Sequence, residues 1–406
     1  MTGTAQDRIT EVEIENVRSI GRLRLALDGL VVLIGPNAAG KSTVLECLEI
    51  LAKAGQHLDF MSEGVSRHGP LDSLLRSGET TMRFGATIEG GDSTLTYSFA
   101  LTRMAREQYV ISSERLVAVT GPLQGRVLLE RTQSACATLN PLTGEMVPVA
   151  FQPTALLIGQ LPWAASSEMD RTRRALKGIR VHVPFDVTPI WIANEERRQP
   201  ELREAAQIGK ALELNRRGGN LANCFHALKA DPAFQWPRIL DRVRLGLGAD
   251  VVDLMTPAAG RGLIELVVSF RGLRDPVPAA CLSDGQLTYL AFVALVEMSP
   301  GGLLAIDEPE LHLHPELVVR VVGLLEDLAL RQPILVATQS DRVLDALADP
   351  QRSVMLCDLD EKRRMQVLRP DAERLQEWLA EFSGLGRIRE NDYLPLVMKR
   401  DAAATS

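Results

Sequence analysis

Aromatic residues are scarce in this sequence. Phenylalanine, tyrosine and tryptophan together make up 4% of its 406 residues. A surface that holds single-stranded nucleic acid by stacking needs one ring for each base, so the composition argues against such a surface. Long hydrophobic runs are also missing, because the longest, at residues 289–298, is about half the length of a membrane-spanning helix and contains Glu297. We therefore expect a cytoplasmic protein with no membrane partner.

Cysteine is scarce as well, and basic charge is not in excess. The cysteines are odd in number, lie far apart and form no Cys-x-x-Cys pair: Cys47, Cys136, Cys224, Cys281 and Cys357. This pattern favours reduced, buried thiols over a disulfide framework or a zinc ribbon. The net charge is −7, so a polyanion would have to bind a local patch, and residues 171–180, 215–219 and 361–366 are the candidates. A nucleic-acid partner is thus left open.

Near the N-terminus, the pattern predicts a strand, a glycine-rich turn and a helix in that order. Residues 29–35 form a continuous apolar run that ends in glycine, as expected for a buried parallel strand. Apolar residues then recur at helical spacing through residues 43–54, with Gly55 as the expected stop. Residues 80–90 and 93–102 alternate apolar and polar side chains on either side of a short turn, and predict an antiparallel hairpin.

The remainder of the chain divides into a poorly periodic segment, a charged block and a second alternation of strands and helices. Residues 105–180 are left without an assignment beyond a weak strand, residues 179–193 are expected to form a strand, and residues 194–247 are expected to be helical. In the final third, strands are expected at 262–270, 301–308 and 333–340, and helices at 284–298 and 315–331. Such alternation is typical of a parallel sheet with helices packed on its faces.

The turn after the first apolar strand, GPNAAGKS, satisfies the phosphate-loop pattern G-x-x-x-x-G-K-[ST]. Its glycines allow backbone N–H groups to surround phosphate oxygens, and the helix that follows adds the positive end of its dipole. Lys41 would reach the outer phosphates of ATP, and the Ser42 hydroxyl would be a ligand for Mg²⁺. The residues predicted to hold the nucleotide are Gly35, Pro36, Asn37, Ala38, Ala39, Gly40, Lys41, Ser42 and Thr43.

A second acidic site follows the apolar residues 303–306. The Asp307 carboxylate is predicted to hold Mg²⁺ through its water shell, and Glu308 is predicted to orient or deprotonate the attacking water. These acids open the stretch DEPELHLHP, whose His312 and His314 could instead hold zinc together with the neighbouring carboxylates. Because Mg²⁺ prefers oxygen ligands and phosphates, we assign the metal to Ser42 and Asp307.

A third phosphate-facing element is predicted in CLSDGQLTYL at residues 281–290. Ser283, Gly285 and Gln286 open an apolar helix, so a hydroxyl, a backbone N–H and the helix dipole would face an anion. Alone, the pattern is often a simple helix cap. Its position shortly before the acidic strand favours nucleotide binding.

The segments GPNAAGKS, LSDGQ, DEPELHLHP and ILVATQS, in this order, resemble the ABC-type ATPase heads of the SMC and RecF-like group. They are most similar to the AAA_15/AAA_21 branch, which includes the ATPase parts of OLD-family proteins. The resemblance implies an α/β P-loop NTPase fold, with a mixed N-terminal β lobe, a parallel-sheet core with flanking helices and a helical signature lobe. We accordingly divide the chain into an N-terminal lobe at 1–195, a helical linker block at 196–260 and a C-terminal lobe at 261–406.

The resemblance also implies a dimer. In such heads two copies sandwich two ATP molecules head to tail, so Ser283 and Gly285 of one copy would complete the site around Lys41 of the other. A homodimer or a higher homo-oligomer is therefore expected. The resemblance places His312 and His314 in the D-loop region at this interface.

Two positions depart from the family pattern, and one element is not found. Gln339 stands where a switch histidine is usual; its amide can hydrogen-bond a γ-phosphate or water but cannot titrate, which predicts slow or partner-gated hydrolysis. Asp284 stands where glycine is common, and would bring a negative charge near the partner's nucleotide. No Q-loop glutamine is identified; Gln56 is a weak candidate, and Arg67 and His68 are expected to serve as loop residues.

The leading hypothesis is an ATPase that hydrolyses Mg·ATP and passes its nucleotide state to a separate effector protein, in bacterial anti-phage defence. A RecF-like DNA-repair ATPase is the alternative within the class. A non-hydrolysing ATP-dependent scaffold is the alternative of another class, against which the intact pair Asp307 and Glu308 argues. A Toprim nuclease domain would need more than the roughly 65 residues that follow the last predicted strand. The long heptad block of an SMC arm is not visible, and an ABC transporter subunit is a poor match.

Overall fold

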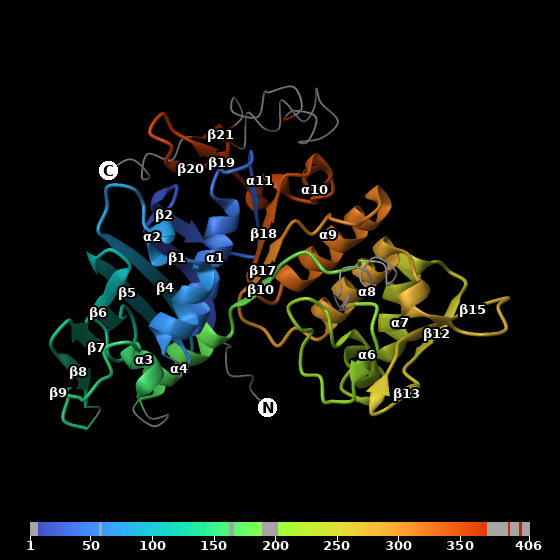
Figure 1. The fold of residues 1–406 in the computed structure, drawn as a ribbon, viewed down its shortest axis with the longest axis horizontal. Coiled ribbons are helices and arrows are strands. Elements are labelled where there is room, and N and C mark those ends of the chain that lie inside the picture. The colour runs from blue at the N-terminus through green and yellow to red at the C-terminus, as the bar shows by residue number, and fades with distance from the viewer. Residues whose placement is uncertain are drawn as a thin grey trace.

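Two large sheets organise the chain. The computed structural model describes residues 7–56, 59–140, 142–161, 166–188 and 202–371, together with residue 389 and residues 398–399. In Figure 1 an eight-stranded sheet lies on the left, a seven-stranded sheet in the middle, and a part that contains α6 (Leu221–Ala230) and α7 (Trp236–Leu247) on the right. This architecture confirms the predicted α/β class.

The seven-stranded sheet carries the strand that precedes the phosphate loop. Its order is β10-β17-β18-β3-β19-β20-β21; the pairs from β10 to β19 are parallel, and β20 and β21 add antiparallel pairs at one edge. The strands are β10 (Arg180–His182), β17 (Leu304–Asp307), β18 (Ile334–Thr338), β3 (Leu30–Ile34), β19 (Val354–Leu359), β20 (Met365–Pro370) and β21 (Met398–Lys399). The predicted strands at 29–35, 301–308 and 333–340 are confirmed. β3 and β18 are buried at every position, which explains their continuous apolar sequences.

The helices around this sheet largely follow the sequence prediction. α1 (Lys41–Ala54) begins directly after the loop that follows β3 and ends at Gly55. α8 (Asp284–Glu297) and α9 (Pro315–Ala329) confirm the two later helices. α8 is buried at every position from 287 to 296, because it packs among α6, α7 and α9, so it shows no polar face. Two shorter helices follow β18: α10 (Asp341–Asp345) and α11 (Pro350–Ser353).

The eight-stranded antiparallel sheet accounts for much of the segment that the sequence left unassigned. Its order is β2-β1-β4-β5-β6-β7-β8-β9. The strands are β1 (Arg8–Val17), β2 (Ile20–Ala26), β4 (Thr81–Gly90), β5 (Ser93–Ala105), β6 (Gln108–Ala118), β7 (Val127–Thr132), β8 (Cys136–Leu139) and β9 (Met146–Pro148). β4 and β5 form the predicted hairpin, which is therefore confirmed. Short helical turns link α1 to this sheet: η1 (Phe60–Val65), η2 (Ser66–His68) and α2 (Leu71–Leu74).

A buried carboxylate attaches α3 (Leu157–Gln160), which is followed in the chain by α4 (Ser167–Lys177), to the sheet. Glu114 of β6 is 1% exposed and accepts the N–H groups of Leu157 at 2.6 Å and Ile158 at 2.8 Å. Burial raises the pKa of Glu114, although these hydrogen bonds oppose the rise. Because this attachment depends on polar contacts, it produces no regular spacing of apolar residues in the sequence, and so no helix was predicted here.

Three predicted elements need correction. The block 194–247 contains α6 and α7, but its described residues from 202 to 220 are not helical; a left-handed glycine, Gly218 with φ of 87°, stands just before α6. The strand predicted at 179–193 ends at His182, because Pro184 has no N–H to donate to a sheet. Residues 189–193 lie outside the described part of the chain.

The strand predicted at 262–270 is divided between two small sheets. β14 (Leu263–Ile264) pairs with β11 (Ala206–Gln207) and β13 (Ala258–Gly260), whereas β15 (Val267–Phe270) pairs with β12 (Val251–Met255) and β16 (Val277–Pro278). The chain changes sheets at Glu265, whose N–H binds the Pro257 carbonyl at 3.1 Å. The part that the resemblance describes as helical thus also contains strands.

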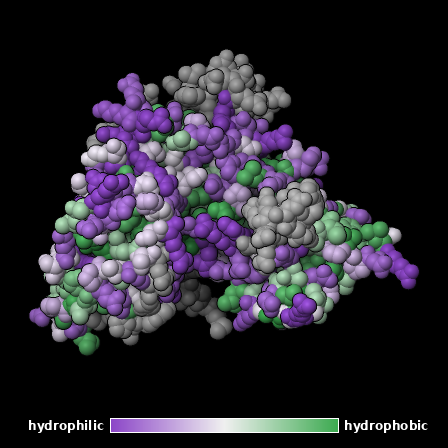
Figure 2. Space-filling view, viewed as in Figure 1, coloured by the Kyte–Doolittle hydropathy of each residue, from purple (hydrophilic) through white to green (hydrophobic). Residues whose placement is uncertain are grey.

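The surface is mainly hydrophilic in the view of Figure 2. Some hydrophobic side chains lie on the part that contains α7 and β12, where Leu245, Val252 and Met255 are exposed. Each helix in the described ranges is too short or too polar to span a lipid bilayer.

Candidate functional site

The phosphate loop is shaped by close contacts that two glycines make possible. A Cβ atom on Gly35 would lie 2.0 Å from the carbonyl oxygen of Cys357 on β19. Gly40 has a φ of 103°, and a Cβ there would lie 2.7 Å from the Ser19 hydroxyl. Packing therefore requires glycine at both positions, and at Gly40 the positive φ requires it as well. Between them Pro36, Asn37 and Ala38 are exposed, and Ala39 is buried.

The start of α1 offers donors to an anion. Gly40 is its N-cap, and no side chain among the described residues caps the helix there. The first N–H groups of a helix have no partner within the helix and carry its positive end. The Ser42 hydroxyl is exposed in the first turn, whereas Thr43 is buried. This part of the loop is thus able to bind phosphate oxygens.

Lys41 is buried and bonds to its own loop. Its side chain is largely covered, with 5% of the residue exposed, and Nζ donates to the Gly35 carbonyl at 2.8 Å and to the Pro36 carbonyl at 3.1 Å. Burial lowers the pKa of Lys41, and the nearby carboxylates of Glu308 and Asp307 oppose this effect. A phosphate that entered the loop would replace the two carbonyls as the partner of this ammonium group.

Asp307 and Ser42 meet where a cation would be held. The Ser42 Oγ atom donates to Asp307 Oδ2 at 3.4 Å, and Asp307 Oδ1 is buried with no hydrogen-bond partner among the described residues. Burial, followed by the charge of Glu308, raises the pKa of Asp307. An unpartnered carboxylate oxygen beside a hydroxyl suits a hard divalent ion such as Mg²⁺. The residues present therefore fit the predicted metal.

Glu308 and Gln339 contact each other across the ends of β17 and β18. The Gln339 Nε2 group donates to Glu308 Oε1 at 2.9 Å, and its backbone N–H donates to Glu308 Oε2 at 3.3 Å. Glu308 has a φ of 44°, in the left-handed region, and its N–H binds the Ala337 carbonyl at 2.7 Å. Such a backbone is rarely adopted without an external constraint, and here β18 supplies it. In this arrangement the Gln339 amide is occupied by Glu308.

Glu310 is a further acid in this site, which the sequence analysis did not single out. The Thr338 hydroxyl donates to its Oε1 atom at 2.5 Å, while its Oε2 atom is buried without a donor among the described residues. Burial, followed by a hydrogen bond with the Glu308 side chain, raises the pKa of Glu310 to about 7. A proton on Glu310 would satisfy both carboxyl groups, because two carboxylates cannot bond to each other without one. The sequence did contain a signal for Glu310, because it is the third acidic residue of DEPELHLHP.

Two arginines also approach the site without any sequence signal. Arg18 lines the phosphate-loop cavity of about 280 Å³ and binds both oxygens of Glu46, at 2.5 and 3.2 Å. Arg389 donates to the Gln339 carbonyl and to Asp341, both at 2.7 Å. The positive charge of Arg389 contributes to the lowered pKa of Lys41. Both arginines are paired with acidic side chains in this arrangement.

Gln56, the weak Q-loop candidate, and His68, expected to be a loop residue, line different cavities. His68 lines a cavity of about 230 Å³ together with Ser42 and Asp307, and its Nδ1 atom lies 3.2 Å from Glu46. Gln56 lines another cavity, with Lys177 and Glu213, and accepts a hydrogen bond from Lys53. The geometry therefore favours His68 over Gln56 as a neighbour of the cation position.

The predicted signature residues lie outside the phosphate-loop cavity of the same chain. Ser283 is the N-cap of α8: its hydroxyl accepts the Gln286 N–H at 3.3 Å and its N–H donates to Gln286 Oε1 at 3.1 Å. Ser283 is exposed. Gly285 lies against the His-x-His segment, because a Cβ there would be 3.2 Å from the His312 carbonyl. The cavity is lined by residues 37–43, Arg18, Ser19, Glu308 and Gln339, and its described lining contains none of the signature residues.

The two histidines of DEPELHLHP follow the acidic residues as a loop. His312 has a φ of 65°, and His314 is the N-cap of α9, which begins at Pro315. Across the described ranges, no group of three or more His, Cys, Asp or Glu side chains is arranged to hold a metal ion. The assignment of a metal to Ser42 and Asp307, completed by phosphate oxygens, needs no such group.

Solved structures with a similar fold include two SMC heads. One is the SmcHead bound to the C-winged helix domain of ScpA, with a TM-score of 0.51 and 11% identity; the match covers 91% of this chain and 99% of that one. The other is the Smc head domain with an extended coiled coil, bound to the C-terminal domain of ScpA, from Pyrococcus furiosus. Its TM-score is 0.51 with 12% identity, and the match covers 93% of this chain and 100% of that one. Among curated proteins the comparison found no match.

The fold is similar to that of these SMC heads, and the loop before α1 has the sequence and position of the phosphate loop of a P-loop NTPase. The family model described as "AAA domain, putative AbiEii toxin, Type IV TA system" matches residues 30–135 and 235–345, more than half of the chain. The chain belongs to this family, AAA_21, as the resemblance had indicated.

The packing around Gly35 gives a direct prediction for its replacement. Gly35→Ala should weaken ATP binding strongly and lower the stability by about 1–3 kcal/mol, because the new methyl group overlaps the β19 backbone. The matched control is Gly323→Ala in α9, where a Cβ meets nothing within 4 Å and alanine favours the helix. Titration with a fluorescent ATP analogue and thermal unfolding would measure both effects. Normal binding by Gly35→Ala would contradict the packing argument.

Glu310 predicts a pH dependence of stability in the nucleotide-free protein. Its pKa is about 7 in the folded chain and about 4.5 when unperturbed, so between these values the folded state keeps a proton that the unfolded state releases. Stability should therefore fall as the pH rises from about 4.5 to 7. Across this window the stability of Glu310→Gln should rise relative to that of the wild type by about 1–3 kcal/mol, since glutamine stays neutral. Denaturant unfolding at pH 5 and pH 8 measures the difference, and parallel pH curves would refute the prediction.

Proposed function

We propose that this chain binds and hydrolyses Mg·ATP, that two copies close head to tail around two nucleotides, and that the nucleotide state is passed to a separate effector protein. The observation that carries the proposal is the meeting of Lys41, Ser42, Asp307 and Glu308 at one edge of the parallel sheet, with a buried Asp307 oxygen left unpartnered. ATP is the substrate and Mg²⁺ the metal that this set of donors fits.

Binding would begin with exchange of partners at the phosphate loop. Lys41 would leave the carbonyls of Gly35 and Pro36 for the outer phosphates, and the first N–H groups of α1 would bind phosphate oxygens. Ser42 and Asp307 would hold Mg²⁺, which when bound supplies positive charge to the phosphate oxygens. Thr43 and the loop residues 36–39 would supply the remaining backbone contacts.

Glu308 is proposed as the group that activates water. Its carboxylate would accept a proton as the water oxygen bonds to the γ-phosphorus and the bond from phosphorus to the bridging oxygen breaks, giving ADP and phosphate. The hydrogen bonds from Gln339 hold this carboxylate at the end of β17. Gln339 would have to release it, or shift with it, before water can approach. A slow or gated reaction follows from this arrangement.

The separation of the signature from the phosphate loop supports action in trans. Ser283 is exposed at the start of α8, and the cavity around Lys41 is lined by other residues. A second copy would place its signature over this cavity. We propose that His312 and His314 lie at the same interface, since the loop that carries them packs against Gly285.

A protein effector is favoured over nucleic acid. All four arginines of the basic segment 171–180 are engaged in ion pairs: Arg171 and Arg174 with Asp7, Arg173 with Asp170, and Arg180 with Glu213. The similar SMC heads carry a domain of another protein, ScpA, according to their descriptions. The toxin–antitoxin description of the family supports a place in bacterial defence. A RecF-like role would require free basic charge, and these pairs reduce it.

The first test separates binding from hydrolysis. Lys41→Met should lose ATP binding while keeping or raising the melting temperature, because a buried ammonium group, whose pKa burial lowers, is replaced by an apolar side chain of similar length. Glu308→Gln should keep binding and lose roughly 100-fold or more in hydrolysis. Equilibrium binding and phosphate release provide the readouts. Undiminished hydrolysis by Glu308→Gln would remove Glu308 from its proposed role, and absence of hydrolysis in the wild type with every effector tried would favour the scaffold alternative.

The second test concerns the switch position. Gln339→His should raise the single-turnover hydrolysis rate, because histidine can accept and donate protons near the γ-phosphate and would no longer hold Glu308 through a side-chain amide. The control is Gln332→His. Gln332 lies just before β18, and its side chain accepts a hydrogen bond from the Ser299 hydroxyl. Equal single-turnover rates for Gln339→His and the wild type would rule out gating by Gln339.

A further inference from the structure

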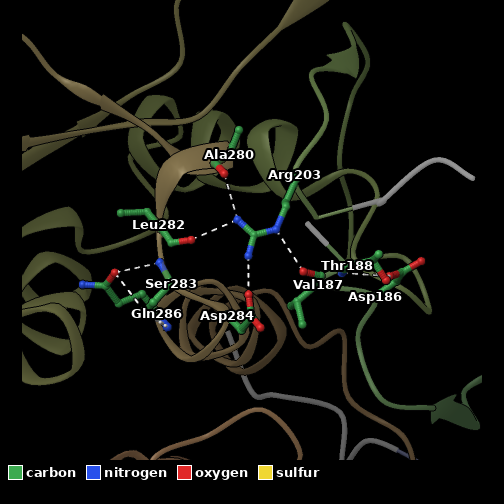
Figure 3. Close-up of polar contacts among 9 residues, drawn as sticks. All are labelled: Asp186, Val187, Thr188, Arg203, Ala280, Leu282, Ser283, Asp284 and Gln286. Atoms are coloured by element: carbon green, nitrogen blue, oxygen red, sulfur yellow. Dashed lines mark hydrogen bonds and ion pairs between the residues drawn. The ribbon is translucent and has the colours of Figure 1, made fainter. Parts of the chain in front are cut away.

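A buried arginine lies directly beneath the signature. Arg203 donates through Nε to the Val187 carbonyl at 2.9 Å, and through one terminal nitrogen to the carbonyls of Ala280 at 2.8 Å and Leu282 at 2.9 Å. Its other terminal nitrogen pairs with Asp284. Figure 3 shows the guanidinium group at the centre of these contacts, beside the first turn of α8.

The charge of Arg203 explains why an acid stands at position 284. The arginine side chain is 6% exposed, and a buried guanidinium keeps its charge, so it needs a carboxylate and satisfied hydrogen bonds. It also lies at the N-terminal end of a helix, where a cation is unfavourable. Asp284 is the first residue of α8 and supplies the compensating charge. The negative charge expected to face the partner's nucleotide is thus paired within the chain.

The contacts fix the backbone on both sides of Ser283. Leu282 and Asp284 are its neighbours in the chain, and Arg203 binds both of them. Ser283 itself keeps its hydroxyl exposed at the start of the helix. The Ser283 hydroxyl, which would meet a phosphate, is therefore exposed and bonded to Gln286 of its own turn, while its two neighbours are held by Arg203.

Arg203 also joins the signature to the strand next to the acidic site. Val187 lies in the segment that leaves β10, and β10 pairs with β17, the strand that ends at Asp307. Val183 in the same segment lines the cavity with Ser42 and Asp307. The Arg203 guanidinium group thus connects two parts of one chain. The first is the segment beside that chain's own cation position. The second is the signature loop, which would contact the nucleotide of the partner.

We propose that Arg203 is a positioning residue for the signature loop, holding residues 280–284 so that Ser283 and Gly285 can bind the nucleotide of a second copy, with Asp284 as its counter-ion. This inference rests on the head-to-tail dimer proposed above. It assigns Arg203 no contact with ATP.

The experiment compares ATP-driven dimerisation in a hydrolysis-deficient parent, Glu308→Gln, with and without Arg203→Met. Sedimentation with Mg·ATP should show a dimer for the parent and an affinity between copies that is roughly tenfold or more weaker for the Arg203 variant, while each copy still binds ATP. Cys281 provides a second readout, because it is exposed two residues before Ser283 and the other four cysteines are buried. ATP should slow its reaction with maleimide in the parent and not in the variant.

A double variant separates positioning from folding. Arg203→Met with Asp284→Asn removes the buried charge together with its partner, so it should melt close to the parent and still dimerise poorly. The matched control, Arg242→Met, removes another buried arginine that binds Glu297 at the far end of α8 and Asp327. It should lower the melting temperature and leave dimerisation at low temperature unchanged.

The outcomes distinguish this inference from the proposed function. A parent that stays monomeric with Mg·ATP overturns the dimer and the inference together. A parent that dimerises, alongside a double variant that dimerises equally well, leaves the dimer standing and overturns the role of Arg203, whose bonds would then serve to neutralise Asp284. A folded double variant with normal ATP binding and defective dimerisation supports the inference.

Discussion

Strand β3 is the element on which the rest of the molecule depends, because its five residues are buried on both faces of the central sheet. Leu30, Val32 and Ile34 belong to the core that contains α8, α9 and the right-hand part of Figure 1. Val31 and Leu33 belong to the core that contains α1 and the antiparallel sheet. The phosphate loop begins at the next residue, so both cores fix its position. Contact of Gly35 with the β19 backbone completes this constraint.

The site at the edge of the sheet is a balance of buried charge. Carboxyl groups of Asp307 and Glu310 are partly desolvated and have raised pKa values, and Lys41 is desolvated with a lowered one. Each shift disfavours the charged form of its group. A bound metal ion would supply positive charge to the carboxyl groups, and phosphates would supply negative charge to Lys41. Electrostatic interactions of this kind are stronger in a site that is shielded from water.

Much of this arrangement could be predicted from the sequence, since local patterns encode it. The apolar strand and glycines around Lys41, the buried helix after Ser283 and the strand before Asp307 each lie within one short segment, and the structure has these elements where they were expected. A hydrophobic run, a glycine or a helix cap acts over a few residues and therefore leaves a readable signal. The order of these motifs along the chain then indicated the fold.

The parts that could not be predicted depend on contacts between distant residues. Arg203 binds backbone carbonyls, which every residue has, so no sequence pattern marks its partners. The same holds for Arg389 at the Gln339 carbonyl and for Glu114 at the backbone of α3. In the small sheets near α7, short strands change partner within a few residues, which a single apolar run cannot reveal. Asp284 illustrates the consequence, because its charge could be read from the sequence but its partner could not.

Several of the proposed functional groups are already bonded within the chain. Lys41 binds carbonyls of its loop, Glu308 is held by Gln339, and the Ser283 hydroxyl is engaged with Gln286. Polar groups in such contacts gain little from a ligand that merely replaces one hydrogen bond with another. A nucleotide would have to displace several contacts together, and the signature contact would require a second copy. In the cycle proposed above, closure of the dimer would therefore govern turnover, and an effector that stabilises either the open or the closed form would control it.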